Sequence, residues 1–549
     1  MTSINLAMHR MSSGLLVTQP RTAKRKTVPF PRHWKETALV SVGFIVVWEI
    51  LALTVFAGRF VVPAPTDVLA TAWKDGFYAP DLGVTLSEAA LGWLIGNGLA
   101  LILAGTSLVF PRLERALLSL GVMTYAVPTV ALGPILFIVQ DPFSAKVTMS
   151  VLSVFFVTLI AAVAGLRSAS RISLELVAAF GGGKWAMLRR VRIRASIPSL
   201  ASGMCISAPA SILGAMVGDY FGGQSGLGVV MLQAQEQLSV SRTWAVALVA
   251  TAVSALAYGL TSMVARLLGA WVSTGTDLAS GQDLSTTAGT NASARSRLFV
   301  LLRVLTSIAV ALGTWALAVK ASGLGGYFLK TPLAVWGYLV TQSGAAQNRD
   351  TVLSSLGTTL FHAGSGWLVG TIAAVIGAVA VSSSPFASRA IMPLVLVTRS
   401  VPLVAMTPLI ALMLGRGLVG ITTISALVTV VPSLVTISNG LKKVPPAALD
   451  LFASAGGSHL QSLFKIRAYY ALPSVFAAAK ISMPGAILGA VLAEWLVAGS
   501  GIGHIMAYDV VGSNFSNLWA SIVSVVSVSL VLYFIVNTSE KAFSSRLAV

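Results

Sequence analysis

The sequence Ser207-Ala-Pro-Ala-Ser-Ile-Leu-Gly-Ala-Met-Val-Gly-Asp-Tyr-Phe-Gly-Gly-Gln-Ser-Gly-Leu-Gly228 returns near the other end of the chain as Ser482-Met-Pro-Gly-Ala-Ile-Leu-Gly-Ala-Val-Leu-Ala-Glu-Trp-Leu-Val-Ala-Gly-Ser-Gly-Ile-Gly503. The shift in numbering is 482 − 207 = 275, and Gly181 and Gly456 keep it. A period of this length indicates whole domains in tandem, because the repeats of solenoids are much shorter. The chain therefore contains two copies of one domain.

The repeat extends toward the N-terminus with almost the same spacing. Gly92, Trp93, Gly96, Pro111 and Arg115 match Gly366, Trp367, Gly370, Pro385 and Arg389, each with a shift of 366 − 92 = 274. A one-residue insertion or deletion between about 135 and 165 explains the change of spacing. Pro65 and Pro332 match at 332 − 65 = 267, so the first outside loop is shorter in the second copy.

The composition predicts an integral membrane protein. Apolar residues make up 56% of the chain, charged residues only 10%, and the mean hydropathy is +0.85. A soluble surface needs about a quarter charged residues, and about 20 apolar residues span a bilayer. Such runs occur six times in each copy, near 38–58, 90–110, 116–140, 146–166, 197–220 and 243–270, and near 298–320, 364–382, 390–414, 418–438, 472–495 and 516–537. The expected fold is all-α, with about twelve transmembrane helices.

The net charge of +19 follows the positive-inside pattern. Lys and Arg gather within 21–35, 112–115, 167–194 and 442–467, whereas Asp67, Asp75 and Asp141 lie in the loops between. This pattern places the basic loops and both termini in the cytoplasm. It also accounts for the positive charge without a nucleic-acid partner, so we expect none. We expect the apolar helices to be surrounded by membrane lipid.

The expected domains are a basic cytoplasmic tail (1–36), a first transmembrane domain (37–272), a flexible cytoplasmic linker rich in Ser, Thr, Ala and Gly (273–297) and a second transmembrane domain (298–549). Six spans per copy give both halves the same orientation, so they can pair about a pseudo-two-fold axis along the membrane normal. Cys205, the only cysteine, excludes an internal disulfide. No metal site is expected.

Two loops at matching positions carry the functional signal. Glu175-Leu-Val-Ala-Ala-Phe-Gly181 is followed by Pro198, and Asp450-Leu-Phe-Ala-Ser-Ala-Gly456 is followed at the same distance by Pro473. A glycine can end a helix in the left-handed conformation, small residues allow another protein to approach closely, and proline is tolerated in the first turn of the next helix. The alternative is an ordinary amphipathic hairpin solvated by its basic residues.

Both loops resemble the Glu-Ala-Ala loop of binding-protein-dependent ABC importer permeases. The resemblance implies that they couple the chain to an ATPase through eight residues, which are Glu175, Ala178, Ala179, Gly181, Asp450, Ala453, Ser454 and Gly456. The second copy departs from the pattern, because Asp450 replaces Glu and Ser454 stands where the first copy has Ala179. Its contact with a partner is therefore expected to be weaker or different.

Further segments resemble the sulfonate, nitrate and taurine branch of these permeases. They are Thr398-Arg-Ser-Val-Pro-Leu-Val-Ala-Met-Thr-Pro-Leu409, its counterpart Thr124-Tyr-Ala-Val-Pro-Thr-Val-Ala-Leu-Gly-Pro-Ile135, and Glu494-Trp with Ser500-Gly-Ile-Gly503. The resemblance covers roughly 60–270 and 327–540. Most members of the branch are single six-span subunits that dimerise, whereas two units are fused here.

The resemblance implies a permease of the bacterial cytoplasmic (inner) membrane that performs no catalysis. The chain has no Gly-x-x-x-x-Gly-Lys-Ser/Thr motif, since Gly181-Gly-Gly-Lys-Trp185 lacks the upstream glycine and the hydroxyl. ATP and magnesium are therefore expected in a separate ATPase, bound in two copies on the cytoplasmic side. A periplasmic or lipid-anchored solute-binding protein is expected outside.

The expected translocation pathway contains Arg399 and Tyr125, which occupy matching positions, together with Pro128 and Pro402. If its span begins at Arg389, Arg399 lies ~15 Å deep, near the middle of the hydrocarbon. A charge at that depth faces a partner or a water-filled path, which favours an anionic solute. Alternatively, Arg399 braces a proline-broken helix or extends to an interface.

Other functions are weaker alternatives. A secondary carrier also has two parallel six-span halves, but it needs coupling groups at the midplane, where only Arg399 is expected. A membrane enzyme needs clustered His, Asp or Glu. The solute stays open among nitrate, taurine, other sulfonates and a vitamin precursor such as a thiamine pyrimidine. Six further charged residues near predicted helix ends are expected to be structural, namely Glu49, Glu88, Asp219, His362, Lys480 and Glu494.

Overall fold

Helices form the two halves of the molecule. The structure is a computed structural model that describes residues 34–56, 62–109, 129–267, 308–309, 311–317, 319–323, 326–400 and 403–547. The predicted tail and linker lie outside these residues, apart from residues 34–36. The helices of the first half are α2 (Trp34–Thr54), α3 (Pro65–Lys74), η1 (Gly76–Tyr78), α4 (Ala79–Val109), α6 (Thr129–Val139), α7 (Pro142–Arg167), α8 (Arg171–Ala179), α9 (Lys184–Met187), η2 (Leu188–Arg192), α10 (Ile193–Gly222), α11 (Leu227–Glu236) and α12 (Val240–Leu267).

The second half repeats this order from α15 onward. Its helices are α15 (Pro332–Trp336), η4 (Gly337–Thr341), α16 (Ala345–Ser383), α17 (Pro385–Ser400), α18 (Leu403–Leu414), α19 (Leu418–Lys442), α20 (Pro446–Ser454), α21 (His459–Ser462), η5 (Leu463–Arg467), α22 (Ala468–Leu496), α23 (Ile502–Val511) and α24 (Phe515–Leu547). Each of α4, α6, α7, α8, α10 and α12 has its counterpart in α16, α18, α19, α20, α22 and α24.

Within the described residues, eight helices are long and apolar enough to cross a membrane. They are Gly76–Ser107, Pro142–Arg167, Lys184–Gly222, Val240–Leu267, Ala345–Ser383, Leu418–Lys442, Leu463–Leu496 and Phe515–Glu540. They account for eight of the twelve predicted spans. Of the other four, 38–58 overlaps α2, 116–140 is described only from residue 129, 390–414 is divided between α17 and α18, and 298–320 lies largely outside the described residues.

Corresponding helices are joined by corresponding contacts. In the first half, Trp93 Nε1 of α4 donates to Ser207 Oγ of α10 at 3.1 Å. In the second, Trp367 Nε1 of α16 donates to Ser482 Oγ of α22 at 3.0 Å. The repeat seen in the sequence therefore extends to the side-chain packing between its helices.

The one-residue difference between the copies lies within 134–150, a narrower range than the sequence indicates. Pro134 of α6 and Pro408 of α18 differ in number by 408 − 134 = 274. Ser150 of α7 and Ser425 of α19 differ by 425 − 150 = 275, and both donate to a backbone carbonyl of the helix packed beside them, α10 or α22. The extra residue of the second copy therefore falls between its Pro408 and Ser425.

Helices α4 and α16 begin earlier than their predicted starts near 90 and 364. α4 begins at Ala79 and α16 at Ala345, so Glu88 and His362 lie within helices and not near their ends. The apolar runs underestimated the helices because the polar residues that precede them are satisfied by neighbouring helices. Glu88 and His362 are both buried.

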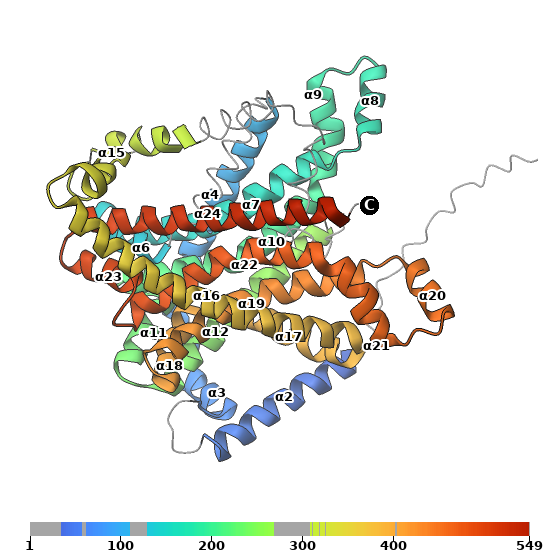
Figure 1. The fold of residues 1–549 in the computed structure, drawn as a ribbon. Helices are drawn as coiled ribbons and strands as arrows, with labels where there is room; N and C mark the ends of the chain where they lie inside the picture. Colours follow the sequence, from blue (N-terminus) through green and yellow to red (C-terminus); the bar gives the residue numbers. More distant parts are fainter. Residues whose placement is uncertain are drawn as a thin grey trace, which may run out of the picture.

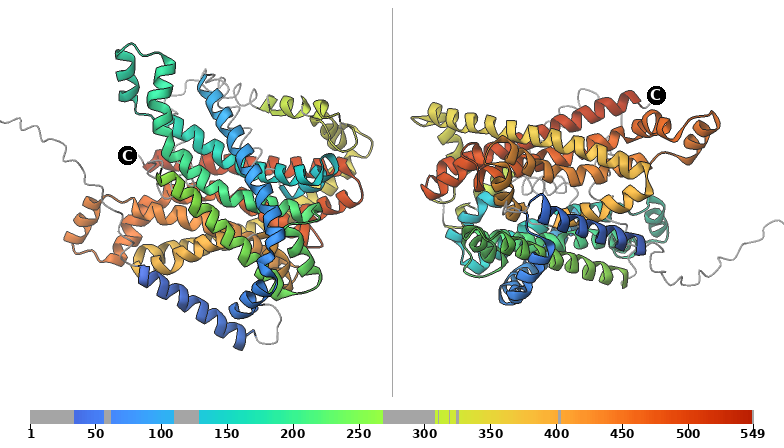
Figure 2. Two further views of the ribbon diagram at one scale, coloured as in Figure 1. Left: turned by 180° about the vertical axis from the view of Figure 1, so that it is seen from behind. Right: turned by 90° about the horizontal axis from the view of Figure 1, so that it is seen from below.

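The two halves lie against each other as two layers (Figure 2). Small parts of each half pack into the other. Ile135 of α6 belongs to the apolar core of the second half, and Met406 of α18 packs against the core of the first. This exchange of contacts joins the halves without a shared helix.

Candidate functional site

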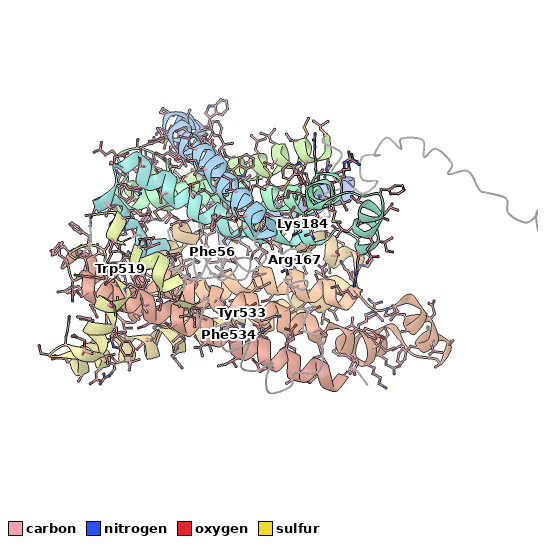
Figure 3. All side chains as sticks on the ribbon, turned by 90° about the horizontal axis from the view of Figure 1, so that it is seen from above. Phe56, Arg167, Lys184, Trp519, Tyr533 and Phe534 are labelled. Carbon is pink, nitrogen blue, oxygen red and sulfur yellow. The ribbon has the colours of Figure 1, made fainter. Side chains whose placement is uncertain are left out.

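Short helices α8 and α20 project from the same end of the helix bundle (Figure 1). Each follows a long helix, α7 or α19, and each precedes the helix that runs back through the bundle, α10 or α22. Arg167 and Lys184, which flank α8, lie far from Trp519 at the other end of the bundle (Figure 3). One such loop therefore stands on each half.

Gly181 and Gly456 end these two helices with the same hydrogen-bond pattern. Their φ angles are +75° and +80°. In the first loop, Gly181 N donates to Ala178 O at 2.9 Å and Gly182 N to Val177 O at 2.9 Å. The second loop repeats both bonds one repeat length later, at 3.0 Å each. This is the Schellman arrangement, in which a glycine takes the left-handed conformation at little cost. The predicted helix-glycine-helix geometry is confirmed in both copies.

The prediction that proline opens the returning helix is wrong. Pro198 and Pro473 each lie inside α10 or α22, in the second turn of the helix. A short π-helical turn, η2 or η5, precedes α10 or α22 and connects it to α9 or α21. Proline has no N–H to donate to the carbonyl four residues earlier, and wider turns accommodate such interruptions of the helical hydrogen bonds.

All eight predicted coupling residues are exposed. They are Glu175, Ala178, Ala179, Gly181, Asp450, Ala453, Ser454 and Gly456. Large apolar side chains are exposed beside them, with Phe180 and Trp185 at 84% and 73% in the first loop and Leu451 at 73% in the second. Exposed apolar groups on a projecting loop favour contact with another protein.

The two loops differ in charge and polarity. In the first, Arg171 Nε lies 3.1 Å from Glu175 Oε1, and both side chains are well exposed. In the second, Ser454 Oγ donates to Leu451 O at 2.8 Å, so its hydroxyl is used within the loop. A surface ion pair such as Arg171–Glu175 adds little stability, which leaves Glu175 free to exchange partners.

The structure leaves the predicted pathway residues untested. Tyr125, Pro128 and Pro402 lie outside the described residues. Arg399 is the penultimate residue of α17, and its side chain is outside the described part. Their role in translocation stays a prediction.

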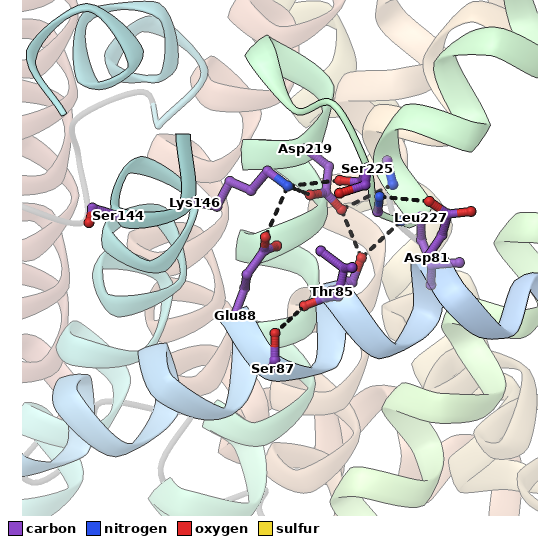
Figure 4. Close-up of polar contacts among 12 residues, drawn as sticks. Asp81, Thr85, Ser87, Glu88, Ser144, Lys146, Asp219, Ser225 and Leu227 are labelled. Atoms are coloured by element: carbon purple, nitrogen blue, oxygen red, sulfur yellow. Dashed lines mark hydrogen bonds and ion pairs between the residues drawn. The ribbon is translucent and has the colours of Figure 1, made fainter. Parts of the chain in front are cut away.

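A buried cation joins three helices in the first half (Figure 4). Lys146 Nζ of α7 lies 2.9 Å from Glu88 Oε1 of α4 and 2.8 Å from Asp219 Oδ1 of α10. It also donates to Ser225 O at 2.8 Å, in the loop that follows α10. All three charged residues are buried. Since removing one partner would leave a charge unpaired, the cluster fixes the three helices relative to one another.

Asp219 also holds the loop after α10. Its Oδ2 accepts from Thr85 Oγ1 at 2.8 Å and from Gly228 N at 3.2 Å, while Leu227 N donates to Thr85 Oγ1 at 2.9 Å. Gly226, at φ +120°, passes so close that a Cβ there would stand 2.3 Å from Asp219 Oδ2. The repeated glycines are therefore needed for this close approach.

The second half keeps the acid and loop but changes the positive partner. Glu494 Oε2 accepts from Thr359 Oγ1 at 2.7 Å and from Gly503 N at 3.0 Å. Its Oε1 contacts His362 Nδ1 at 2.8 Å. His362 stands one repeat after Glu88, and Ile421 one repeat after Lys146. The first half thus pairs the ammonium group of Lys146 with two carboxylates, whereas the second half pairs the imidazole of His362 with one carboxylate, that of Glu494.

The polar residues that were expected to be structural do have structural contacts. Glu49 accepts from the backbone N–H and hydroxyl of Thr66 at the start of α3. Lys480 of α22 pairs with Glu540 of α24 at 2.5 Å. Lys146 and the matching threonines Thr85 and Thr359, which hydrogen-bond Asp219 and Glu494, did not stand out in the sequence. A comparison of the copies for charge changes would have found Lys146, because it matches an isoleucine.

Comparisons with known proteins agree with the two-copy organisation. A model of the family described as "Binding-protein-dependent transport system inner membrane component" matches the chain twice, at residues 96–274 and 366–549. No solved structure matches the chain.

Three relatives each align with less than half of this chain. A "Probable ABC transporter permease protein" of Haemophilus influenzae is 29% identical over 43% of this chain and 93% of its own length. The formylaminopyrimidine transport permease protein ThiX of Halalkalibacterium halodurans is 28% identical over 35% of this chain and 78% of its own length. SsuC of Bacillus subtilis, named as a putative aliphatic sulfonates transport permease protein, is 27% identical over 48% of this chain and 98% of its own length. The relatives are thus about the size of one half.

Proposed function

The chain belongs to the family of binding-protein-dependent transport system inner membrane components, and from this premise we propose that it is a permease of an ATP-driven importer in which two permease units are fused. It is a multi-pass membrane protein of a transport family, not an enzyme. In this proposal each half supplies one wall of the solute path, and two copies of a separate ATPase supply the energy.

The two matched loops carry this proposal. Helices α8 and α20 have the same glycine-capped geometry, stand one on each half, and project from one end of the bundle (Figure 1). Two motors could therefore act on the two halves from the same side. ATP would bring the motors together, α8 and α20 would move with them, and the halves would rock to open the path alternately outward and inward.

We further propose that α8 and α20 face the cytoplasm of a bacterium, with both termini on that side. The basic residues around α8 support this orientation by the positive-inside rule. A periplasmic or lipid-anchored solute-binding protein would deliver the solute at the opposite face. ATP and magnesium would bind only in the motor.

The proposed solute is a small anion, such as a sulfonate, taurine or nitrate. The intramembrane position expected for Arg399 and the relative named for aliphatic sulfonates support this choice. An uncharged or cationic heterocycle is the second candidate, because one relative is named for formylaminopyrimidine and another, RibX of Chloroflexus aurantiacus, for riboflavin transport.

Reconstitution tests the proposal. The chain would be placed in lipid vesicles with candidate ATPase and solute-receptor subunits from the same organism, and uptake of radiolabelled taurine, an alkanesulfonate, nitrate and an aminopyrimidine would be measured. We expect one class of solute to accumulate only with ATP and all three components. ATP turnover by the purified chain alone would contradict the proposal, as would accumulation driven by an ion gradient without ATP.

A further inference from the structure

The ends of α10 and α22 farthest from the projecting loops meet in an apolar cluster between the halves. Phe221 is the penultimate residue of α10, and at 1.5 Å per residue it lies about 42 Å along the helix. It follows the anchored Asp219 by two residues, and Trp495 follows the anchored Glu494 directly. Both aromatic residues are therefore mounted on fixed ends of helices.

Phe221 and Trp495 touch across the two halves. Their ring centroids are 5.9 Å apart and their planes meet at 88°, the edge-to-face geometry that aromatic pairs favour. Each half contributes three residues to the cluster, which we name the aromatic seam: Val217, Tyr220 and Phe221 from α10, and Leu492, Trp495 and Leu496 from α22.

Close contacts at two glycines pack α6 against the end of α10, and the one at Gly133 makes room for the Phe221 ring. A Cβ on Gly133 of α6 would stand 2.7 Å from the Phe221 ring, and one on Gly222 would stand 2.8 Å from Phe137. Tyr220 is held separately, since its hydroxyl hydrogen-bonds Gln235 Oε1 of α11 at 2.9 Å. The Phe221 ring is thus fitted between α6 and the opposite half.

The seam is not symmetric, although the helices are. One repeat length after Tyr220 stands Trp495, and one repeat length after Phe221 stands Leu496. Two identical subunits would carry the same residue types at both pairs of matching positions. Here the contact joins a phenylalanine of one half to a tryptophan of the other.

The geometry points to the aromatic seam as the outer gate of the solute path, closed in this structure, with Phe221 and Trp495 as its latch. This inference rests on the proposed function, because a gate needs alternating access. A constriction lined by apolar side chains excludes water and ions when it is closed. The halves can part there because the latch is an apolar ring contact, whereas the buried polar networks behind it lie within each half.

A reversible cross-link tests the gate. In a Cys205→Ser background, Phe221→Cys and Trp495→Cys would be combined and treated with a bifunctional methanethiosulfonate carrying a one-carbon spacer. The matched control is Trp315→Cys with Trp519→Cys, whose rings stack at 5.5 Å within the second half. Both variants would be studied as complexes with the ATPase, without nucleotide and after trapping with ATP and vanadate.

We expect the 221–495 pair to cross-link without nucleotide and at least tenfold more slowly in the trapped complex. The cross-linked complex should lose ATP turnover and recover it on reduction, whereas the control pair should link equally in both states and leave turnover unchanged. Equal cross-linking of 221–495 in both states, full turnover while linked, or no link in either state would overturn the gate. Failure of the Cys205→Ser complex, which keeps both rings, to hydrolyse ATP would instead contradict the proposed function.

Discussion

Lys146 shows at the scale of one residue what holds the first half together. Its ammonium group lies within 2.9 Å of both Glu88 and Asp219, and all three side chains are buried. Such a cluster gives little net stability over an apolar core of the same shape, but the loss of one partner is costly. Its value lies in fixing α4, α7 and α10 to one another.

We predict that Lys146→Met strongly destabilises the protein, by about 3–5 kcal/mol, because two carboxylates remain buried without a cation. Thermal unfolding in detergent and the amount of protein in the membrane would measure the effect. Adding Glu88→Gln should restore part of the loss, since it removes one of the two charges. A Lys146→Met variant as stable as the wild type would contradict the role assigned to the cluster.

A second prediction at this scale concerns Asp509 in α23, which is too short to span a membrane. Its Oδ2 accepts from Asn517 Nδ2 at 2.8 Å, and burial raises the pKa of Asp509 to about 6. Because the folded protein disfavours the ionised form, its stability should fall as the pH rises from about 4, the ordinary Asp pKa, through about 6.

Asp509→Asn should remove that part of the pH dependence. At pH 7.5 the variant should melt higher than the wild type by about 2 °C, the order expected for ~1 kcal/mol in a large chain, and near pH 4 the two should agree. Asp67→Asn, on an exposed face of α3, is the matched control. If the melting temperatures of the wild type and Asp509→Asn differed by the same amount at pH 4 and at pH 7.5, this effect of burial would be ruled out.

At the scale of elements, the capping glycines of α8 and α20 should be essential for coupling. Replacing Gly181 and Gly456 by tryptophan forces a bulky residue into the left-handed region at a cost of roughly 1–2 kcal/mol each, and it alters the exposed surface. We expect the double variant to reach the membrane but to lose most ATP-driven uptake. Gly183→Ala, at φ −73° with open space around it, is the control. Normal uptake by the double variant would mean that the loops do not couple.

The unequal loops predict unequal binding of the ATPase. Glu175→Ala should reduce co-purification of the ATPase more than Asp450→Ala, because the first loop keeps the acidic and alanine pattern and has more basic residues beside it. A lost contact of about 1 kcal/mol corresponds to roughly a fivefold change in affinity. Equal losses at matched membrane levels would show that the asymmetry has no mechanical effect.

The sequence predicted elements better than it predicted contacts. The constant shift between the copies identified both halves and both loops, and glycine chemistry predicted the left-handed ends at Gly181 and Gly456. Hydropathy missed the early start of α4, because Glu88 is satisfied by Lys146 from another helix. Contacts of this kind depend on packing between segments far apart in the chain, which no local pattern contains.

At the scale of the whole molecule, the halves should assemble without a covalent connection. Ile135 and Met406 each pack into the opposite core, and the aromatic seam joins α10 to α22. If the chain is divided at residue 285, within the predicted linker, the two pieces co-expressed in one cell should co-purify and support uptake. Recovery of only separate pieces, each present in the membrane, would show that the linker is required to hold the halves together.

The different partners of Asp219 and Glu494 also show how mutations act on a fused chain. In a permease made from two copies of one gene product, every mutation changes both subunits. A new charge therefore appears twice. In this chain a codon change at Lys146 alters only the first half, because Ile421 has its own codon, which mutates independently. Fusion therefore lets each half accumulate its own substitutions, as the different partners of Asp219 and Glu494 illustrate.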